Sequence, residues 1–257
     1  MQHISFSALK NWNQCPYYYK LTYVDKIKRF VGNHYTAFGT ALHEVCELNA
    51  EDNDLTGLPE LFESAFLKEL QSLPEEVRKG LKPKDIQDMR EQGRRLSVVA
   101  IPALKTHFGE FEVVSTEEDL YESIEDFEDY NFKGFIDLVI KTPDGKFHVI
   151  DWKTCSWGWN AQKKSDPMVT YQLTYYKHFY AKKHGVPLKD IETHFGLLKR
   201  TSKKDLVEIF RVTSGNRKIS NAMELLSRAL YNIQSGKFIK NKLSCRLCEF
   251  RNTPECP

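Results

Sequence analysis

The amino-acid sequence predicts an α/β fold in which helices cover a central mixed β-sheet. The clearest observation is a pair of strand-like segments, residues 132–141 and 146–153, separated by the turn-forming residues 142–145. A second observation is the order of the other patterns: helices and a strand precede this pair, and a helix, two strands and a helix follow it. Such an order is typical of a sheet that lies between layers of helices.

The N-terminal half is predicted to be mainly helical. Residues 38–51 carry apolar side chains at helical spacing, and residues 59–110 contain at least two helices that prolines interrupt. This second segment is rich in Lys, Arg, Glu and Gln. We therefore interpret residues 53–110 as a helical insertion within a single domain that spans residues 1–257.

An acidic segment, residues 112–129, leads into the central pair of strands. It contains nine carboxylates and neither Lys nor Arg, and its alternating hydrophobic residues predict a strand in its first part. After the central pair we expect a helix, two strands and a helix, at residues 168–184, 191–199, 205–213 and 215–235.

Composition limits the possible classes of protein without choosing among them. The chain has 257 residues, 41% of them hydrophobic, which suits one domain with a sizeable core. Its net charge is only +2, so any nucleic-acid-binding face must come from local patches. The N-terminal residues lack the apolar core of a signal peptide, and no stretch approaches the roughly 18 apolar residues of a membrane span. We expect a cytoplasmic protein, host- or phage-encoded, without a membrane partner.

Two carboxylates and a lysine are predicted to meet in the central hairpin. Asp151 and Lys153 are two residues apart and share a face of their strand. A three-residue loop, with Gly145 in the left-handed position, would place Asp137 opposite Asp151 on that face; a two-residue loop would shift the pairing by one. A divalent cation would offset the cost of burying these groups, and oxygen ligands suit Mg²⁺ or Mn²⁺. The alternative is a buried Asp–Lys ion pair without metal.

A histidine on the first predicted helix is a candidate third ligand. Gly39, His43 and Glu47 fall on one face of that helix, so His43 would reach the carboxylates if the helix packs against the sheet. The segment also resembles half of the HExxH motif of zinc proteases, but Glu47 replaces the second histidine, which makes a protease a poor interpretation.

Together these residues resemble the motifs of the PD-(D/E)XK nucleases, most closely those of the RecB-like and CRISPR-associated branch that carries iron–sulfur clusters. Asp137 followed by Asp151-Trp152-Lys153 is similar to the D…DxK core of that superfamily. Residues 39–43 are similar to its GxxxH element, and residues 172–176 to its QxxxY element. Asp151 stands where many members have Glu, and both residues are used in the superfamily.

The resemblance implies a restriction-endonuclease-like core and a role for each motif residue. The metal ligands would be His43, Asp137, Asp151 and the main-chain carbonyl of Trp152. Lys153 would act in catalysis together with the two carboxylates. Gln172 and Tyr176, one helical turn apart, would face the DNA or brace Lys153; a surface Gln beside a packed Tyr is the alternative.

Four of the six cysteines lie near the two ends of the chain: Cys15, Cys245, Cys248 and Cys256. Thiolates with a CxxC spacing bind zinc or an iron–sulfur cluster. Because one ligand comes from the opposite end of the chain, as in the nucleases that the chain resembles, we expect a [4Fe–4S] cluster rather than zinc. It would tie Cys15 to residues 236–257, and its loss should destabilise the protein. Cys46 and Cys155 are interpreted as ordinary thiols, without disulfides.

Basic and aromatic residues suggest a surface for DNA. Positive charges cluster near residues 163–164, 199–204 and 237–246, where they would neutralise phosphates. Two tryptophans and a run of tyrosines, Trp157, Trp159 and Tyr17 to Tyr19, are candidates for stacking on unpaired bases. Solvated charges and core aromatics are the alternative for each of these residues.

The sequence thus predicts a Mg²⁺- or Mn²⁺-dependent deoxyribonuclease, an exonuclease acting on single strands or duplex ends. Its context would be DNA recombination, repair, CRISPR adaptation or phage DNA processing, and a helicase or recombination protein would be a separate partner because no P-loop is present. Two rival hypotheses are a non-catalytic iron–sulfur DNA-binding subunit and a zinc-stabilised hydrolase that acts on another substrate.

Overall fold

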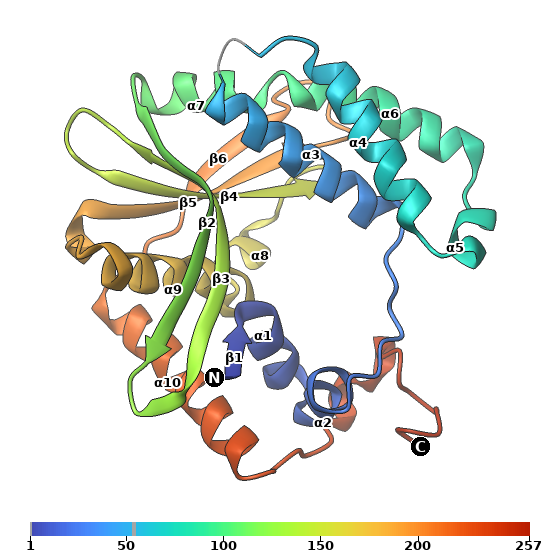
Figure 1. Cartoon of the computed structure of the whole chain (residues 1–257), viewed down its shortest axis with the longest axis vertical. Helices are drawn as coiled ribbons and strands as arrows, with labels where there is room; N and C mark the ends of the chain where they lie inside the picture. The colour runs from blue at the N-terminus through green and yellow to red at the C-terminus, as the bar shows by residue number, and fades with distance from the viewer. Residues whose placement is uncertain (1, 53–54) are drawn as a thin grey trace.

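A mixed sheet lies at the centre of the computed structural model, which describes residues 2–52 and 55–257 (Figure 1). Within these residues the strand order is β1-β3-β4-β5-β6, with β2 paired to β3 off this path. The pairs β1/β3 and β4/β5 are parallel and the other pairs antiparallel. The six strands are β1 (Gln2–Ser5), β2 (Glu112–Ile124), β3 (Phe127–Lys141), β4 (Phe147–Cys155), β5 (Ile191–Lys199) and β6 (Val207–Arg211). The predicted α/β fold with a mixed sheet is confirmed.

The hairpin of β3 and β4 has the three-residue loop that the sequence predicts. Gly145 has a φ of 82°, in the left-handed region that glycine adopts without steric cost. The two strands pair up to Leu138 and Ile150, so the next residues along this register are Asp137 and Asp151. The two carboxylates therefore stand opposite each other on adjacent strands.

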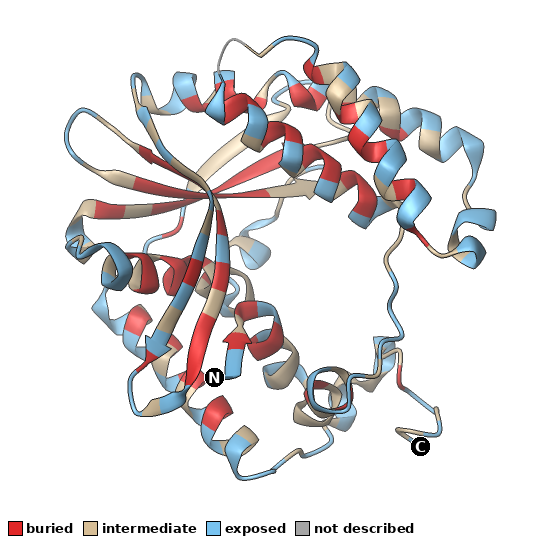
Figure 2. Ribbon diagram, in the orientation of Figure 1, coloured by how far each residue is buried: buried red, intermediate tan, exposed pale blue. Residues whose placement is uncertain are grey.

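One face of the sheet is covered by the helices of the N-terminal half: α3 (His34–Glu51), α4 (Leu58–Ser72), α5 (Glu75–Lys79), α6 (Pro83–Ser97) and α7 (Ala100–Phe108). The buried sides of α3, α4, α6 and α7 are directed toward the sheet and toward one another (Figure 2). The helices α4 and α6 approach closely at Gly93, where a Cβ atom would lie 1.9 Å from the Phe62 ring. The proposed insertion, residues 53–110, contains α4 to α7; residues 53 and 54 lie outside the described residues.

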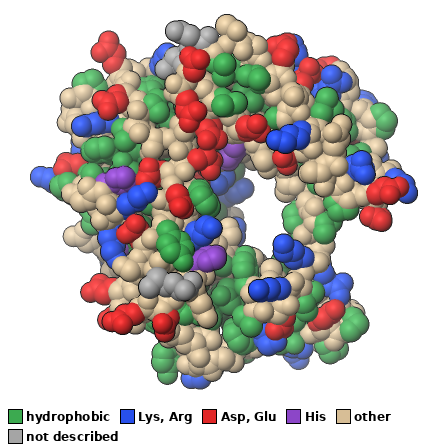
Figure 3. All heavy atoms as spheres, in the orientation of Figure 1, with side chains coloured by type: hydrophobic (Ala, Val, Ile, Leu, Met, Phe, Trp, Pro, Cys, Tyr) green, Lys and Arg blue, Asp and Glu red, His purple; other side chains and the backbone are tan. Residues whose placement is uncertain are grey.

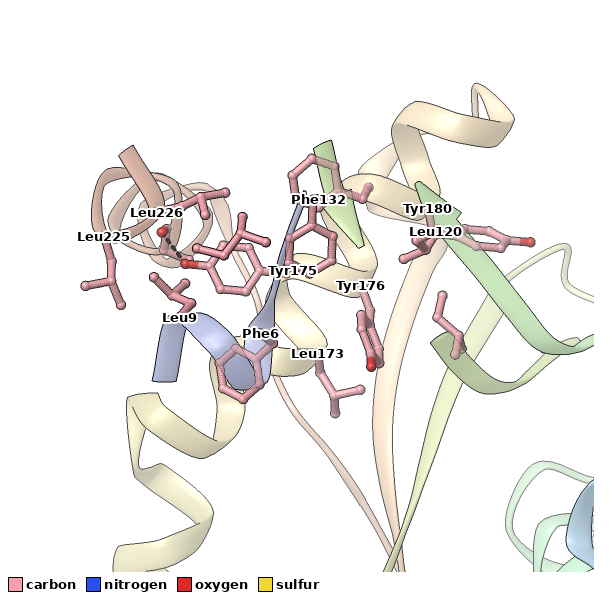
Figure 4. Packing of buried hydrophobic residues seen from close by; sticks show 14 of the residues in the cluster. Phe6, Leu9, Leu120, Phe132, Leu173, Tyr175, Tyr176, Tyr180, Leu225 and Leu226 are labelled. Atoms are coloured by element: carbon pink, nitrogen blue, oxygen red, sulfur yellow. Dashed lines mark hydrogen bonds between the residues drawn. The ribbon is translucent and has the colours of Figure 1, made fainter. Parts of the chain in front are cut away.

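The other face packs against α9 (Pro167–His184), α10 (Asn216–Gln234) and α1 (Phe6–Gln14). Figure 4 shows aromatic side chains of α9 between the sheet and α10. Phe132 of β3 stacks on Phe179 with ring centroids 4.4 Å apart. The Tyr175 hydroxyl donates a hydrogen bond to the carbonyl of Ala222, which satisfies a polar group inside this core. The α9 helix is thereby fixed on the sheet beside the hairpin.

The two terminal segments lie against each other. They contain short helical elements: α2 (Pro16–Tyr19), the π-helical η1 (Lys20–Val24) and the 3-10 helix η3 (Lys242–Leu247). The Tyr17 hydroxyl donates to the Glu255 carbonyl (3.1 Å), and the Tyr18 hydroxyl donates to Glu249 (2.8 Å). Tyr19 is buried. The tyrosine run therefore packs the two ends together, and the expectation that it stacks on bases is wrong for Tyr19.

The remaining differences from the predicted elements are at their ends. The helix predicted over 38–51 begins four residues earlier, because the side chains of Asn33 and Thr36 form a capping box. The N-terminal elements β1, α1, α2 and η1 were not predicted, and neither were the short α8 (Ala161–Ser165), η2 (Leu188–Asp190) and η3. Among the described residues, no helix combines the length and the apolar character that a membrane span needs.

Candidate active site

The two carboxylates of the hairpin meet the histidine of α3. The Nδ1 atom of His43 lies 3.4 Å from Oδ2 of Asp137, and both side chains are mostly buried. The helix α3 reaches this position because Ala41, Leu42 and Val45 pack in the hydrophobic core between the sheet and the helices α4 to α7. The structure thus brings the predicted helical ligand to the predicted strand ligand.

The main chain of Trp152 connects these two side chains. Its N–H donates a hydrogen bond to Oδ2 of Asp137 (2.7 Å), and its backbone also forms a hydrogen bond with His43. The indole ring is buried against Gly196 of β5, where a Cβ atom would lie 2.3 Å from the ring. A side chain at residue 196 would therefore displace the strand segment that orients the site.

Asp151 is almost completely buried, at 1% exposure, and its two oxygens have different surroundings. The Oδ1 atom accepts a hydrogen bond from Nε2 of Gln172 on α9 (2.8 Å). The Oδ2 atom forms an ion pair with Lys153 but receives no hydrogen bond of good geometry from the described residues. The Lys153 ammonium supplies positive charge to this buried oxygen, so a cation that bound here would share the oxygen with Lys153.

The electrostatics of the site follow from burial. Burial raises the pKa of Asp137 and of Asp151 to about 6, although the Lys153 ammonium opposes the shift. Burial, and then Lys153, lowers the pKa of His43 to about 4. For Lys153 itself burial lowers the pKa, but the two carboxylates outweigh it and the pKa rises. At neutral pH the site holds two carboxylates, one ammonium and a neutral imidazole.

This set of donors fits a hard divalent cation. A neutral His43 has a lone pair to offer, and Asp137 and Asp151 supply carboxylate oxygens of the kind that Mg²⁺ and Mn²⁺ prefer. The Oδ2 atom of Asp151, which pairs with Lys153, would be the ligand atom of that side chain. The three ligand atoms are not within 4.8 Å of one another, so binding would require them to draw together.

The predicted pair on α9 faces the site from the other side. Gln172 donates to Asp151 and also to the hydroxyl of Tyr176 (3.1 Å). This contact is with the carboxylate rather than with Lys153. Both side chains also line a cavity of about 370 Å³ together with His3 and Lys133. Gln172 is therefore placed to orient Asp151 and to border any substrate in that cavity.

A second groove begins where β4 ends. It has a volume of about 480 Å³ and is lined by residues 154–160, Lys163, Tyr35 and Arg200. The two tryptophans of this loop differ: Trp157 is 76% exposed, whereas Trp159 packs against Phe195 with ring centroids 5.1 Å apart. Trp157 thus remains a candidate for stacking, and Trp159 is part of the packing.

The four terminal cysteines line one cavity of about 250 Å³: Cys15, Cys245, Cys248 and Cys256. The N–H of Asn241 donates to the Sγ atom of Cys15 (3.3 Å), which suits a thiolate. No three of the sulfur atoms lie within 4.8 Å of one another. The other two cysteines are elsewhere, Cys46 buried in α3 and Cys155 at the end of β4.

Two features of the site were missed by sequence reasoning. Glu117 of β2 stands opposite Asp137 in the register and has a φ of 43°, which is unusual within a strand; its charge raises the pKa of Asp137 and His43. It was noticed only as part of an acidic segment. The second is a compact group of His148, Glu192 and His194 on the opposite face of the sheet.

Comparisons with known proteins concern the family and the fold. The model of the PD-(D/E)XK nuclease superfamily matches residues 3–253. A crystal structure from Eubacterium rectale, named there only provisionally as an exonuclease, has a TM-score of 0.62 at 11% identity, covering 96% of this chain and 86% of that chain. The structure of SSO0001 has a TM-score of 0.40, too low to support an argument, at 17% identity over 84% of this chain and 92% of that chain. No curated protein matches.

Proposed function

The chain belongs to the PD-(D/E)XK nuclease superfamily, and from that premise we propose that it is a Mg²⁺- or Mn²⁺-dependent exonuclease that hydrolyses phosphodiester bonds in DNA. The observation that carries the proposal is the pairing of Asp137 and Asp151 across the hairpin, with His43 and Lys153 beside them. Members of the superfamily are hydrolases of phosphodiester bonds, and the four side chains that the motifs require are all present.

Each side chain has a separate task in the proposed reaction. His43, Asp137, Asp151 and the carbonyl of Trp152 would hold the cation, which supplies Lewis acidity toward a phosphoryl oxygen and lowers the pKa of a bound water. Lys153 lies beside Asp151 and would stabilise negative charge that develops on the phosphate. Gln172 keeps Asp151 oriented through its hydrogen bond to Oδ1.

The surroundings support a single-stranded DNA end as substrate. Figure 3 shows an opening through the molecule between the helical layer and the joined terminal segments, with Lys and Arg side chains on its rim. The cavity at Gln172 includes the side chain that contacts Asp151, and the groove at Trp157 begins at Thr154, the residue after Lys153. A strand that passes through such an opening needs a free end, which favours exonuclease action. Trp157 would stack on a base.

We further propose that the terminal cavity holds a [4Fe–4S] cluster. A single tetrahedral zinc ion, with Zn–S bonds of about 2.3 Å, needs sulfur atoms roughly 3.8 Å apart. The four sulfurs share a cavity but are more widely spaced than that in every group of three. What supports the cluster is the sequence pattern, one distant cysteine with a CxxC pair and a last cysteine, together with the single cavity that the four thiols line.

The test is an anaerobic purification followed by incubation with end-labelled linear and closed circular single-stranded DNA. Reactions contain Mn²⁺, Mg²⁺ or EDTA, and Lys153→Met serves as the inactive control. Metal-dependent loss of linear DNA, with circles intact, is expected. Cleavage of circles would replace the exonuclease by an endonuclease. A folded protein that binds DNA but cleaves neither substrate would contradict the nuclease proposal and favour a non-catalytic DNA-binding subunit, a partner for a separate helicase.

A further inference from the structure

The face of the sheet opposite the carboxylates carries a second compact group of ligand atoms. In the register of β4 and β5, His148 pairs with Glu192, and His194 follows two residues later on the same face. The Nδ1 atom of His148 lies 3.2 Å from Nε2 of His194. Both nitrogens are 3.9 Å from Oε2 of Glu192. The three side chains are 3–14% exposed, so the group is mostly shielded from water.

From this geometry we infer that His148, Glu192 and His194 form a zinc site separate from the nuclease centre. An ion with bonds of about 2.0–2.1 Å to nitrogen and oxygen, in tetrahedral geometry, needs ligand atoms roughly 3.3 Å apart. The observed separations of 3.2 and 3.9 Å are close to this value. Two imidazoles and one carboxylate are also a ligand set that zinc uses in proteins, leaving a fourth position for water.

The hydrogen bonds around the group leave its inner atoms free for an ion. The Thr142 hydroxyl donates to Asp144, so its oxygen accepts a hydrogen bond from Nε2 of His148 (3.0 Å). The Nδ1 atom of His148 therefore carries its lone pair toward His194. Outer partners of this kind fix the tautomer of metal-binding histidines in other proteins.

The carboxylate is arranged in the same way. Arg211 binds Oε1 of Glu192 (3.0 Å), and Lys146 lies 3.9 Å from that same oxygen, so Oε2 is left to the two histidines. Burial lowers the pKa of His148, and lowers that of His194 to about 3, so both rings are neutral at physiological pH. The two nearby cations oppose an added positive charge and should make binding weaker than in a purely anionic site.

The ion would bind Nε2 of His194 and not its Nδ1. The Nδ1 atom has no hydrogen-bond partner among the described residues and would remain a buried donor, a cost that lowers the affinity for the ion. In the absence of an ion, a single N–H···N contact between the two imidazoles would be their only mutual bond. A bound ion would link β4, which carries His148, to β5, which carries Glu192 and His194. The hydrogen bond between His148 and Thr142 would connect the β3–β4 loop to the same ion. The strand β4 carries Asp151 three residues further on.

The nitrogen-rich ligand set distinguishes this site from the carboxylate centre, because imidazole favours zinc over Mg²⁺. This distinction allows a clean test on the full chain. The protein is first reconstituted with the proposed [4Fe–4S] cluster at its four terminal cysteines. It is then dialysed against excess Mg²⁺ and a limiting concentration of Zn²⁺, and the zinc bound per chain is counted by mass spectrometry. X-ray absorption at the zinc edge then reports whether the neighbours are nitrogen and oxygen or sulfur. Neither readout depends on cleavage of DNA, so the result stands apart from the proposed nuclease function.

We expect one zinc per chain with nitrogen and oxygen neighbours. His194→Gln and Glu192→Gln should each lose that zinc, whereas His107→Gln, an exposed control with its ring 6.1 Å from His194, and Cys248→Ser should keep it. Equal zinc content in the wild type and both ligand variants would overturn the inference, as would zinc that disappears only in Cys248→Ser. Because Glu192 is the least buried ligand, Glu192→Gln carries the test if His194→Gln does not fold.

Discussion

The carboxylate centre and the cysteine cavity both assemble side chains from distant parts of the sequence, but by different means. Asp137 and Asp151 stand opposite each other because paired strands inside the main core fix their positions. The cysteines sit on short helical turns and irregular segments. In the tail that carries three of them, Leu243 and Leu247 are 95% and 92% exposed. The carboxylate centre is thus surrounded by buried apolar side chains, whereas the cysteine cavity has few of them around it.

The difference indicates what each centre contributes. The strands hold the two carboxylates together even without a bound ion. Burial of these charged groups lowers the free energy of unfolding. A centre with few apolar contacts of its own depends on the bound group for its order. We therefore expect the first to govern activity and the second to govern stability.

The largest expected effect is on activity. Asp151→Asn keeps the shape and the neighbour Gln172 but removes the charge that would hold the cation. We expect metal-dependent cleavage to fall by a factor on the order of 10²–10³, by comparison with the loss of one electrostatic contact in other enzymes. The rate of cleavage is measured as the release of nucleotides from linear DNA. Glu224→Gln, an exposed change on α10, is the control and should retain full activity.

The same variant should weaken the pH dependence of the stability of the metal-free protein. Because burial raises the folded pKa of Asp151 to about 6, folding favours the protonated form. Its contribution to the free energy of unfolding is greatest below the unfolded pKa near 4 and is lost as the pH rises through about 6. Urea unfolding in EDTA from pH 4.5 to 8 should show a smaller decline for Asp151→Asn than for the wild type. An identical pH profile for the two proteins would contradict the burial argument.

The next effect concerns the cysteine cavity. Cys248→Ser should lower the midpoint of thermal unfolding by roughly 5–10 °C, since a loss of about 2–3 kcal/mol shifts a chain of this size by a few degrees per kcal/mol. The absorbance of an iron–sulfur cluster should disappear with it. Cys155→Ser, which changes a cysteine outside the cavity, is the matched control. Equal midpoints of thermal unfolding for the two variants would show that the cysteine cavity does not stabilise the joined ends of the chain. The proposed difference between the two centres would then be wrong.

The smallest effect is expected at the groove between the loop after β4 and Arg200. Trp157→Ala should weaken binding of single-stranded DNA about tenfold, because one stacked base contributes on the order of 1–3 kcal/mol. Fluorescence anisotropy with a labelled oligonucleotide in EDTA measures binding without cleavage. Tyr231→Ala, which removes an aromatic side chain that is 59% exposed on α10, should bind normally. If the Trp157→Ala variant binds single-stranded DNA with unchanged affinity, the DNA does not bind in this groove.

Much of the fold could be predicted because its signals are local. The loop of Pro143, Asp144 and Gly145 determines the hairpin register, and with it the opposition of Asp137 and Asp151. The strand β5 was predicted with its observed bounds, and α9 within one residue of them. In these segments the hydrophobic period and the terminating residues agree with the tertiary packing.

What could not be predicted depends on pairing between distant segments. The strand β1 has only four residues and forms through its parallel pairing with β3, which no local pattern indicates. The group around His148 requires β4 and β5 to lie side by side in a known register, and neither strand shows it alone. Likewise, Gln172 contacts Asp151 only because of how α9 packs on the sheet, and the sequence predicted the DNA or Lys153 as its partner instead.

The joining of the terminal segments has a consequence for biosynthesis. Cys15 is translated long before its three companions, which lie between positions 245 and 256. The pocket that they line therefore cannot exist while the intervening residues are still being made. The proposed cofactor can bind all four thiols only after residue 256 has been synthesised, and Cys15 must stay reduced until then. Maturation of the protein thus has a fixed order, with the nuclease sheet able to form before the cofactor arrives.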